Sequence, residues 1–159
     1  MTAADLREFM EFSRKKTIDL LETIAKRPDA AKVLAWRPGQ GRAPIAWQFM
    51  HIAATDDRHL YVRMRGGEPK SPDNVRRFAG GSTPDDDTPS IDTIRGYLAE
   101  RRKEMLDHLA TIDSAALATK PNPQAPWTYH EWFQVLAWHE AHHQGQAHLT
   151  FNLYKAAHD

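Results

Sequence analysis

Histidine is the residue type whose number and spacing in this sequence point most directly to chemistry. Six of the nine histidines lie in the last thirty residues, and His139 and His143 are four positions apart. In a helix, side chains at this spacing are about 5–6 Å apart at Cβ, which suits two imidazoles that bind one metal ion. Both positions fall on the apolar stripe of a helix expected at 129–156. Because two imidazoles on one apolar stripe must both stay neutral or share a cation, we favour a metal site over a hydrogen-bonded core pair.

A third ligand is expected from another helix, and His51 is the best candidate. It interrupts the apolar run 45–52 of a helix expected at 44–65. Three convergent imidazoles leave coordination positions open for water or substrate. His59 and His108 are weaker candidates, since both lie at helix positions that could be exposed. Three further histidines are expected to face solvent: His130, His148 and His158.

The segment 139–143 also reads H-E-x-x-H, the motif of zinc peptidases in which the glutamate is the general base. Gln146 and Leu149 stand where the longer form of the motif has a glycine and a third histidine. No glutamate follows Glu140, and no sheet edge is expected that could hold a peptide strand. We therefore do not favour a peptidase. Glu140 is expected behind the ligands instead, where it would orient an imidazole.

Proline and glycine divide the chain into the elements that must position these residues. Four long stretches lack proline, which is costly inside a helix, and no segment shows the alternation of a strand. Pro44 suits a first helical position, and Thr128 with Glu131 forms a capping-box pattern. The sequence therefore predicts an all-α four-helix bundle, with helices at about 3–27, 44–65, 90–112 and 129–156.

The link between the second and third of these helices, about 66–88, is long enough to change the topology. A helix of this length measures on the order of 30 Å, and more than twenty residues can cross that distance. We therefore expect a crossover that makes helices 2 and 3 parallel, in an up-down-down-up order. Within the link, Asp85–Asp87 is interpreted as a solvated acidic tip rather than as a cation site.

The composition limits what such a bundle could do. The 159 residues include 21 Lys and Arg, 21 Asp and Glu, and no Cys. With no net charge, nothing indicates binding to nucleic acid or to an anionic membrane surface, and no apolar stretch is long enough to span a membrane. Without cysteine, disulfides, thiolate ligands and a thiol nucleophile of its own are excluded. We expect one domain over 1–159 and a cytoplasmic protein.

Two motifs give the chain a resemblance to a known family. The pattern W-x-x-x-H-I at Trp47, His51 and Ile52, with H-E-A-H-H-x-G-Q over 139–146, resembles the DinB/YfiT-like superfamily. The resemblance covers essentially the whole chain, including the long crossover. It implies a metal triad at His51, His139 and His143, with accessory positions at His142 and Gln146. At Gln144 many members carry a basic residue, so anion binding is not carried over to that position.

The resemblance further implies a divalent ion, zinc or nickel, with waters completing its shell. Characterised branches are thiol-dependent transferases or isomerases that use low-molecular-weight thiols, and some resemble hydrolases. Since this chain has no cysteine, any thiol must arrive as a cosubstrate, to become a thiolate at the metal, and the same site could activate water. Members often form homodimers, although no residue here indicates one. A substrate pocket is expected at Trp47, Thr55, Arg58 and Trp132.

Two other functions remain open from the sequence. The first is a non-catalytic module whose metal is structural or sensory, which a closed fourth ligand would favour. The second is a metal-free bundle whose histidines are core residues. Two or more exchangeable waters facing a pocket would favour the enzyme.

Overall fold

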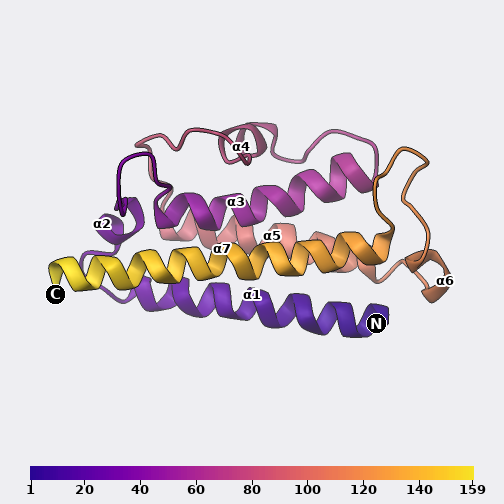
Figure 1. Cartoon of the computed structure of the whole chain (residues 1–159), viewed down its shortest axis with the longest axis horizontal. Helices are drawn as coiled ribbons and strands as arrows, with labels where there is room; N and C mark the ends of the chain where they lie inside the picture. The colour runs from indigo at the N-terminus through magenta and orange to yellow at the C-terminus, as the bar shows by residue number, and fades with distance from the viewer.

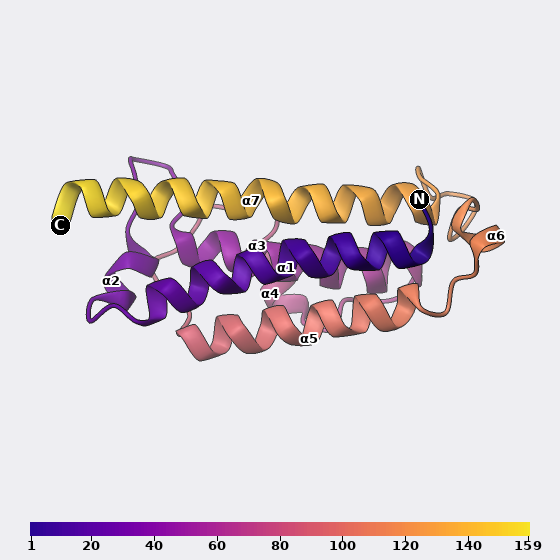
Figure 2. The same cartoon turned by 90° about the horizontal axis from the view of Figure 1, so that it is seen from below.

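The computed structural model describes residues 1–159, and all of its regular structure is helical. This confirms the predicted all-α class. Four long helices form the body of the molecule, and they lie side by side in Figures 1 and 2. Their bounds are α1 (Ala3–Ala25), α3 (Ile45–Arg58), α5 (Ile91–Leu109) and α7 (Tyr129–His158). None of the helices combines the length and the apolar character needed to span a bilayer.

The four long helices pack in a closed square. α3 lies against α5 and α7, and α1 lies against the same two helices on the other side. The colour gradient in Figures 1 and 2 shows α1 and α7 running one way along the long axis, with α3 and α5 running the other way. The segment 66–88 therefore returns along the molecule from the end of the second long helix to the start of the third.

The helix ends follow local capping chemistry, with one correction. Thr128 caps α7: its hydroxyl accepts from the Glu131 N–H at 3.2 Å, while the Glu131 carboxylate accepts from the Thr128 N–H at 2.8 Å. The predicted capping box is confirmed. Pro44 is the residue before α3 rather than its first helical residue. Its extended backbone and missing N–H fit that position equally well, because an N-cap N–H has no intrahelical partner.

The second predicted helix, 44–65, ends in a different helical form. After Arg58 the chain continues as a π-helical segment, η1 (His59–Met64), in which the Arg65 N–H reaches back five residues to the Leu60 carbonyl at 3.1 Å. Such turns are uncommon and often occur at functional sites. Apolar periodicity does not distinguish them from an α-helix, so this segment could not be predicted from the sequence.

Three short helices in the linkers were not predicted: α2 (Ala30–Ala35), α4 (Pro72–Arg77) and α6 (Ser114–Leu117). They are too short to show a periodic pattern. α4 lies in the long crossover and packs on α3, so this link is ordered against the bundle (Figure 1). Gly81, with φ of 87°, supplies the left-handed turn that follows α4, a conformation open to glycine because it has no Cβ.

The acidic tip of the crossover is paired with arginines. Arg77 binds the Asp85 carboxylate with two hydrogen bonds of 2.7 Å and forms an ion pair with Asp87 at 3.0 Å. Arg37 forms an ion pair with Asp86 at 3.1 Å. The three aspartates are exposed, in agreement with the predicted solvated tip, and arginines of the chain pair with their carboxylates.

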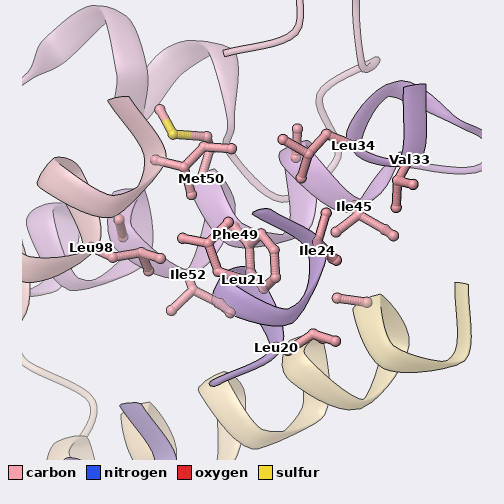
Figure 3. Close-up of a cluster of buried hydrophobic side chains, with 14 of the residues drawn as sticks. Leu20, Leu21, Ile24, Val33, Leu34, Ile45, Phe49, Met50, Ile52 and Leu98 are labelled. Atoms are coloured by element: carbon pink, nitrogen blue, oxygen red, sulfur yellow. The ribbon is translucent and has the colours of Figure 1, made fainter. Parts of the chain in front are cut away.

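The core consists of two apolar clusters stacked along the bundle. Figure 3 shows the larger one, where Phe49 and Ile52 of α3 pack against Leu21 of α1. The smaller one lies toward the other end and contains Phe133 of α7 and Met105 of α5. Buried polar residues separate the two clusters at mid-height on all four long helices, among them Arg14, Asp56, Arg102 and Glu140. The candidate site lies beside this polar layer.

Candidate metal centre

Three histidines from two helices converge at the side of the bundle. α3 supplies His51, and α7 supplies His139 and His143, which its regular turn places on one face. One ring nitrogen from each histidine lies within 4.8 Å of the other two, so the group could hold a metal ion. Nε2 of His139 is 3.0 Å from Nε2 of His51. The structure therefore brings together the three residues that the sequence singled out as ligands.

Hydrogen bonds fix the orientation of two of these rings. Nδ1 of His51 lies 2.6 Å from the backbone carbonyl oxygen of Phe78, and Nδ1 of His143 lies 2.6 Å from Oε1 of Gln48. Because these oxygens only accept, each Nδ1 must carry the hydrogen, and each Nε2 is left with a free lone pair. Ligating histidines in metalloproteins are commonly held in this way. Trp47 stacks on the His51 ring at 4.6 Å and 12°, which further limits its rotation.

Burial keeps the three rings neutral. It lowers the pKa of His51, although the Phe78 carbonyl acts in the opposite direction. For His139, burial and then the neighbouring histidines lower the pKa to about 2, and for His143 the same causes lower it to about 3. A metal ion binds the neutral imidazole, so at neutral pH no proton has to be removed first. Three neutral imidazoles, two of them with Nδ1 hydrogen-bonded to an acceptor, suit a divalent transition-metal ion, and the residues present fit such an ion.

A cavity of about 240 Å³ opens beside His51 and His139. Of the four residues expected to line a substrate pocket, Thr55 and Arg58 line this cavity. Trp47 does not, because it stacks behind His51. Trp132 lines a separate cavity near the end of η1. The remaining wall comes from α3 and η1, the crossover and α7, with Ala54, His59, Val75, Phe78, Ala79, Gly80, Val135 and Leu136.

His59 plays a larger part in this cavity than its sequence position indicated. It is half-buried, lies on the cavity wall and contacts the edge of Trp132 at 4.8 Å between ring centroids. Its Nδ1 donates to the carbonyl of Thr55 at 2.7 Å, so its Nε2 is the unprotonated nitrogen. Burial lowers its pKa, and it is therefore a neutral proton acceptor in the cavity wall.

Glu140 does not orient an imidazole. Its carboxylate is fully buried and accepts from Arg14 Nε at 2.6 Å, from the Thr17 hydroxyl at 2.8 Å and from Arg102. Arginine pairing keeps its pKa below the ordinary value, although burial alone would raise it. One residue of helical rotation, about 100°, turns Glu140 from the histidine face toward α1 and α5. The expectation that it orients a metal ligand is thus corrected.

The accessory residues hydrogen-bond to each other rather than to the triad, although the His142 ring packs against that of His143 at 5.0 Å between centroids. Nε2 of Gln146 lies 2.7 Å from Nε2 of His142, and His142 is exposed and stacks on Trp138 at 5.3 Å. Two hydrogen-bond partners of the triad, Gln48 and the Phe78 carbonyl, were not predicted from the sequence. Gln48 is a polar residue three positions before His51 in an apolar helix, which is a usable signal for a shared face. The Phe78 partner is a backbone carbonyl, for which the sequence has no signal.

The remaining histidines lie away from the site. His148 and His158 are exposed, as expected, whereas His130 is half-buried. His108 is half-buried beside Tyr129, at 5.8 Å between ring centroids. None of them joins the group of three ring nitrogens.

Comparison with known proteins agrees with the resemblance noted in the two motifs. Residues 10–147 match the DinB superfamily. No curated protein matches the chain. The match includes α3 and the part of α7 that bears the histidines, and the fold is all-helical as that family requires. The chain belongs to the DinB superfamily.

Proposed function

We propose that this protein is a divalent-metal-dependent enzyme whose ion, zinc or nickel, is held by His51, His139 and His143. The observation that carries the proposal is the triad itself: neutral imidazoles, two of them fixed with Nε2 free, at the wall of a cavity. Bound there, the ion would supply a nucleophile at neutral pH, by lowering the pKa of a small thiol or of water.

The chain's own residues would prepare the cavity for that chemistry. Phe78, Val135 and Leu136 give the reacting groups an apolar wall that limits access of bulk water. His59 faces the same cavity with Nε2 free, so it can accept a proton from a group that enters. Since the chain has no cysteine, a thiol would have to come from a cosubstrate. A thiol transferase-like reaction is the first candidate, and a hydrolase-like reaction is the second.

A purely structural metal is the main alternative, and the donor set argues against it. Structural zinc sites are closed by four protein ligands, whereas catalytic sites keep a position open. No fourth histidine, aspartate or glutamate joins the three ring nitrogens, and the nearest carboxylate along α7, Glu140, is bound by arginines. The arrangement thus leaves positions for water and substrate.

Metal analysis of tag-free protein tests the proposal. After exposure to zinc or nickel and removal of free ion, the wild type should carry about one ion per chain. His51→Ala and His143→Ala should carry none, whereas the control His148→Ala, an exposed histidine on α7, should match the wild type. A wild type without stoichiometric metal would overturn the proposal.

Cobalt substitution separates the enzyme from the structural module. If the site is open, adding 2-mercaptoethanol to the cobalt-loaded protein should produce a thiolate-to-cobalt charge-transfer band. A loaded protein whose spectrum does not change with either thiol or pH would instead support a closed, non-catalytic site.

A further inference from the structure

The cavity beside the triad has an unbalanced charge. Among the residues that line it, Arg58 is the only one with a permanent charge, and no carboxylate is present. The three ligands bind a metal in their neutral form, so they would not reduce the charge of a divalent ion. A loaded cavity would therefore hold a dication and a guanidinium with no anion of the protein to balance them.

Arg58 is also free of polar partners, unlike the buried arginines of the core. It is exposed, and its guanidinium makes no ion pair or hydrogen bond with any residue. By contrast, Arg14 and Arg102 both pair with Asp56 in the core, at 3.0 and 3.1 Å. The guanidinium of Arg58 is thus available to a ligand.

The carboxylates next to Arg58 in the sequence are turned away from the cavity. Asp56 is held by the core arginines, and Asp57 accepts from the backbone N–H groups of Lys70 and Ser71 at 2.7 and 3.0 Å and from the hydroxyl of Tyr97 at 3.1 Å. Neither lines the cavity. Successive helical residues point about 100° apart, so Arg58 faces the cavity while its neighbours face the core.

We propose that Arg58 determines the specificity of the cavity by binding a carboxylate of the small molecule that enters it. The guanidinium fork matches a carboxylate with two parallel hydrogen bonds. Thr55, three residues before Arg58 on the same cavity wall, adds a hydroxyl donor. A volume of about 240 Å³ restricts the occupant to a small molecule. This inference rests on the proposed metal-dependent function and names its substrate class.

A pair of matched thiols tests the inference. Zinc-loaded protein is titrated calorimetrically with 3-mercaptopropionate and with its methyl ester, which has the same skeleton without the charge. The wild type should bind the acid about two- to fivefold more tightly than the ester, the range for an ion pair with an exposed side chain. Arg58→Gln should bring this ratio close to one, with zinc content and ester affinity unchanged.

Two further variants make the result specific to Arg58. Arg58→Lys keeps the charge but not the fork, so it should retain part of the preference for the acid. Arg63→Gln removes an exposed arginine of η1 that lines a different cavity, and it should behave as wild type. The preference should also weaken with ionic strength, because Arg58 is exposed.

Three outcomes would overturn the inference while leaving the metal site standing. These are a wild-type ratio near one, a ratio that persists in Arg58→Gln because the carboxylate binds the ion itself, and a zinc-loaded protein that binds neither thiol. A wild type that takes up no zinc refutes the proposed function, and this inference fails with it. Zinc content, measured before each titration, distinguishes the two failures.

Discussion

The bundle contains two polar clusters that are neighbours but have opposite character. The ion cluster, made of Arg14, Asp56, Arg102 and Glu140, lies between the two apolar cores. Its two cations and two carboxylates balance, and each arginine is bonded to both carboxylates. The three-His site is uncharged, and its free nitrogens face one another beside a cavity.

The contrast shows how a structural polar group differs from a binding site in the same fold. In the ion cluster every charge finds its partner within the chain, so nothing remains for a ligand. In the three-His site, oxygens of the chain accept the Nδ1 hydrogens of His51 and His143. No group outside the triad donates a hydrogen bond to Nε2 of either ring. His139 and Glu140 are consecutive residues, yet each belongs to a different cluster.

Removing a charge from the ion cluster should have the largest effect. Glu140→Ala leaves Arg14 and Arg102 with one carboxylate between them in the core, which should cost about 3–5 kcal/mol in the free energy of unfolding. Urea unfolding of the metal-free protein measures this. Glu8→Ala, at an exposed glutamate of α1, is the control and should change stability by less than about 0.5 kcal/mol. A loss below about 1 kcal/mol for Glu140→Ala would contradict the structural role.

Changing a partner of the triad should affect metal affinity and leave stability nearly intact. Gln48→Leu removes the acceptor of the His143 Nδ1 hydrogen, and such losses typically weaken metal binding about ten- to a hundredfold. Competition with a chelator measures the zinc affinity. Gln146→Leu is the matched control, because Gln146 bonds to His142 and not to the triad. Equal losses in both variants would show that Gln48 does not orient a ligand.

The smallest effect is expected from a group of charged residues at the end of the bundle, the half-buried Arg27 and Asp29 and the exposed Asp159. Arg27 bonds to Asp29 at 2.8 Å and to Asp159 at 2.7 Å, and its hydrogen bond lowers the pKa of Asp29 to about 2. A carboxyl group whose pKa is lower in the folded state stabilises the fold fully at pH values above its unfolded-state pKa, here 3.8. This stabilisation is lost as the pH falls toward the folded-state pKa of about 2.

Arg27→Gln should therefore be slightly less stable than wild type at about pH 5. The difference in the free energy of unfolding between the two proteins, the gap, should narrow as pH falls from about 4 toward 2. Urea unfolding of both proteins across this range measures the gap, so effects of other carboxyl groups cancel. A gap that stays constant with pH would mean that Arg27 acts through packing on Phe151 and Tyr154 instead.

Sequence patterns were sufficient for the parts of the structure that depend on a single helix. Periodicity and proline spacing located the four long helices, and the i, i+4 rule placed His139 beside His143. What they missed depends on contacts between helices. The partners of Glu140 come from α1 and α5, and rotation about α7 alone cannot show whether that face meets a histidine or an arginine. Likewise, Phe78 contributes only a main-chain oxygen, which any residue could supply.

The crossover has a consequence for how fast the site can exchange its contents. Phe78 and Gly80 form part of the cavity wall, and the Phe78 carbonyl also holds the His51 ring. A Cβ on Gly80 would meet that ring at 3.8 Å, so the segment lies directly over it. A displacement of this segment away from the cavity would also break the bond that orients His51. Under the proposed function, entry of substrate and release of the ion would then depend on the same segment, and an occupied cavity should slow the loss of metal.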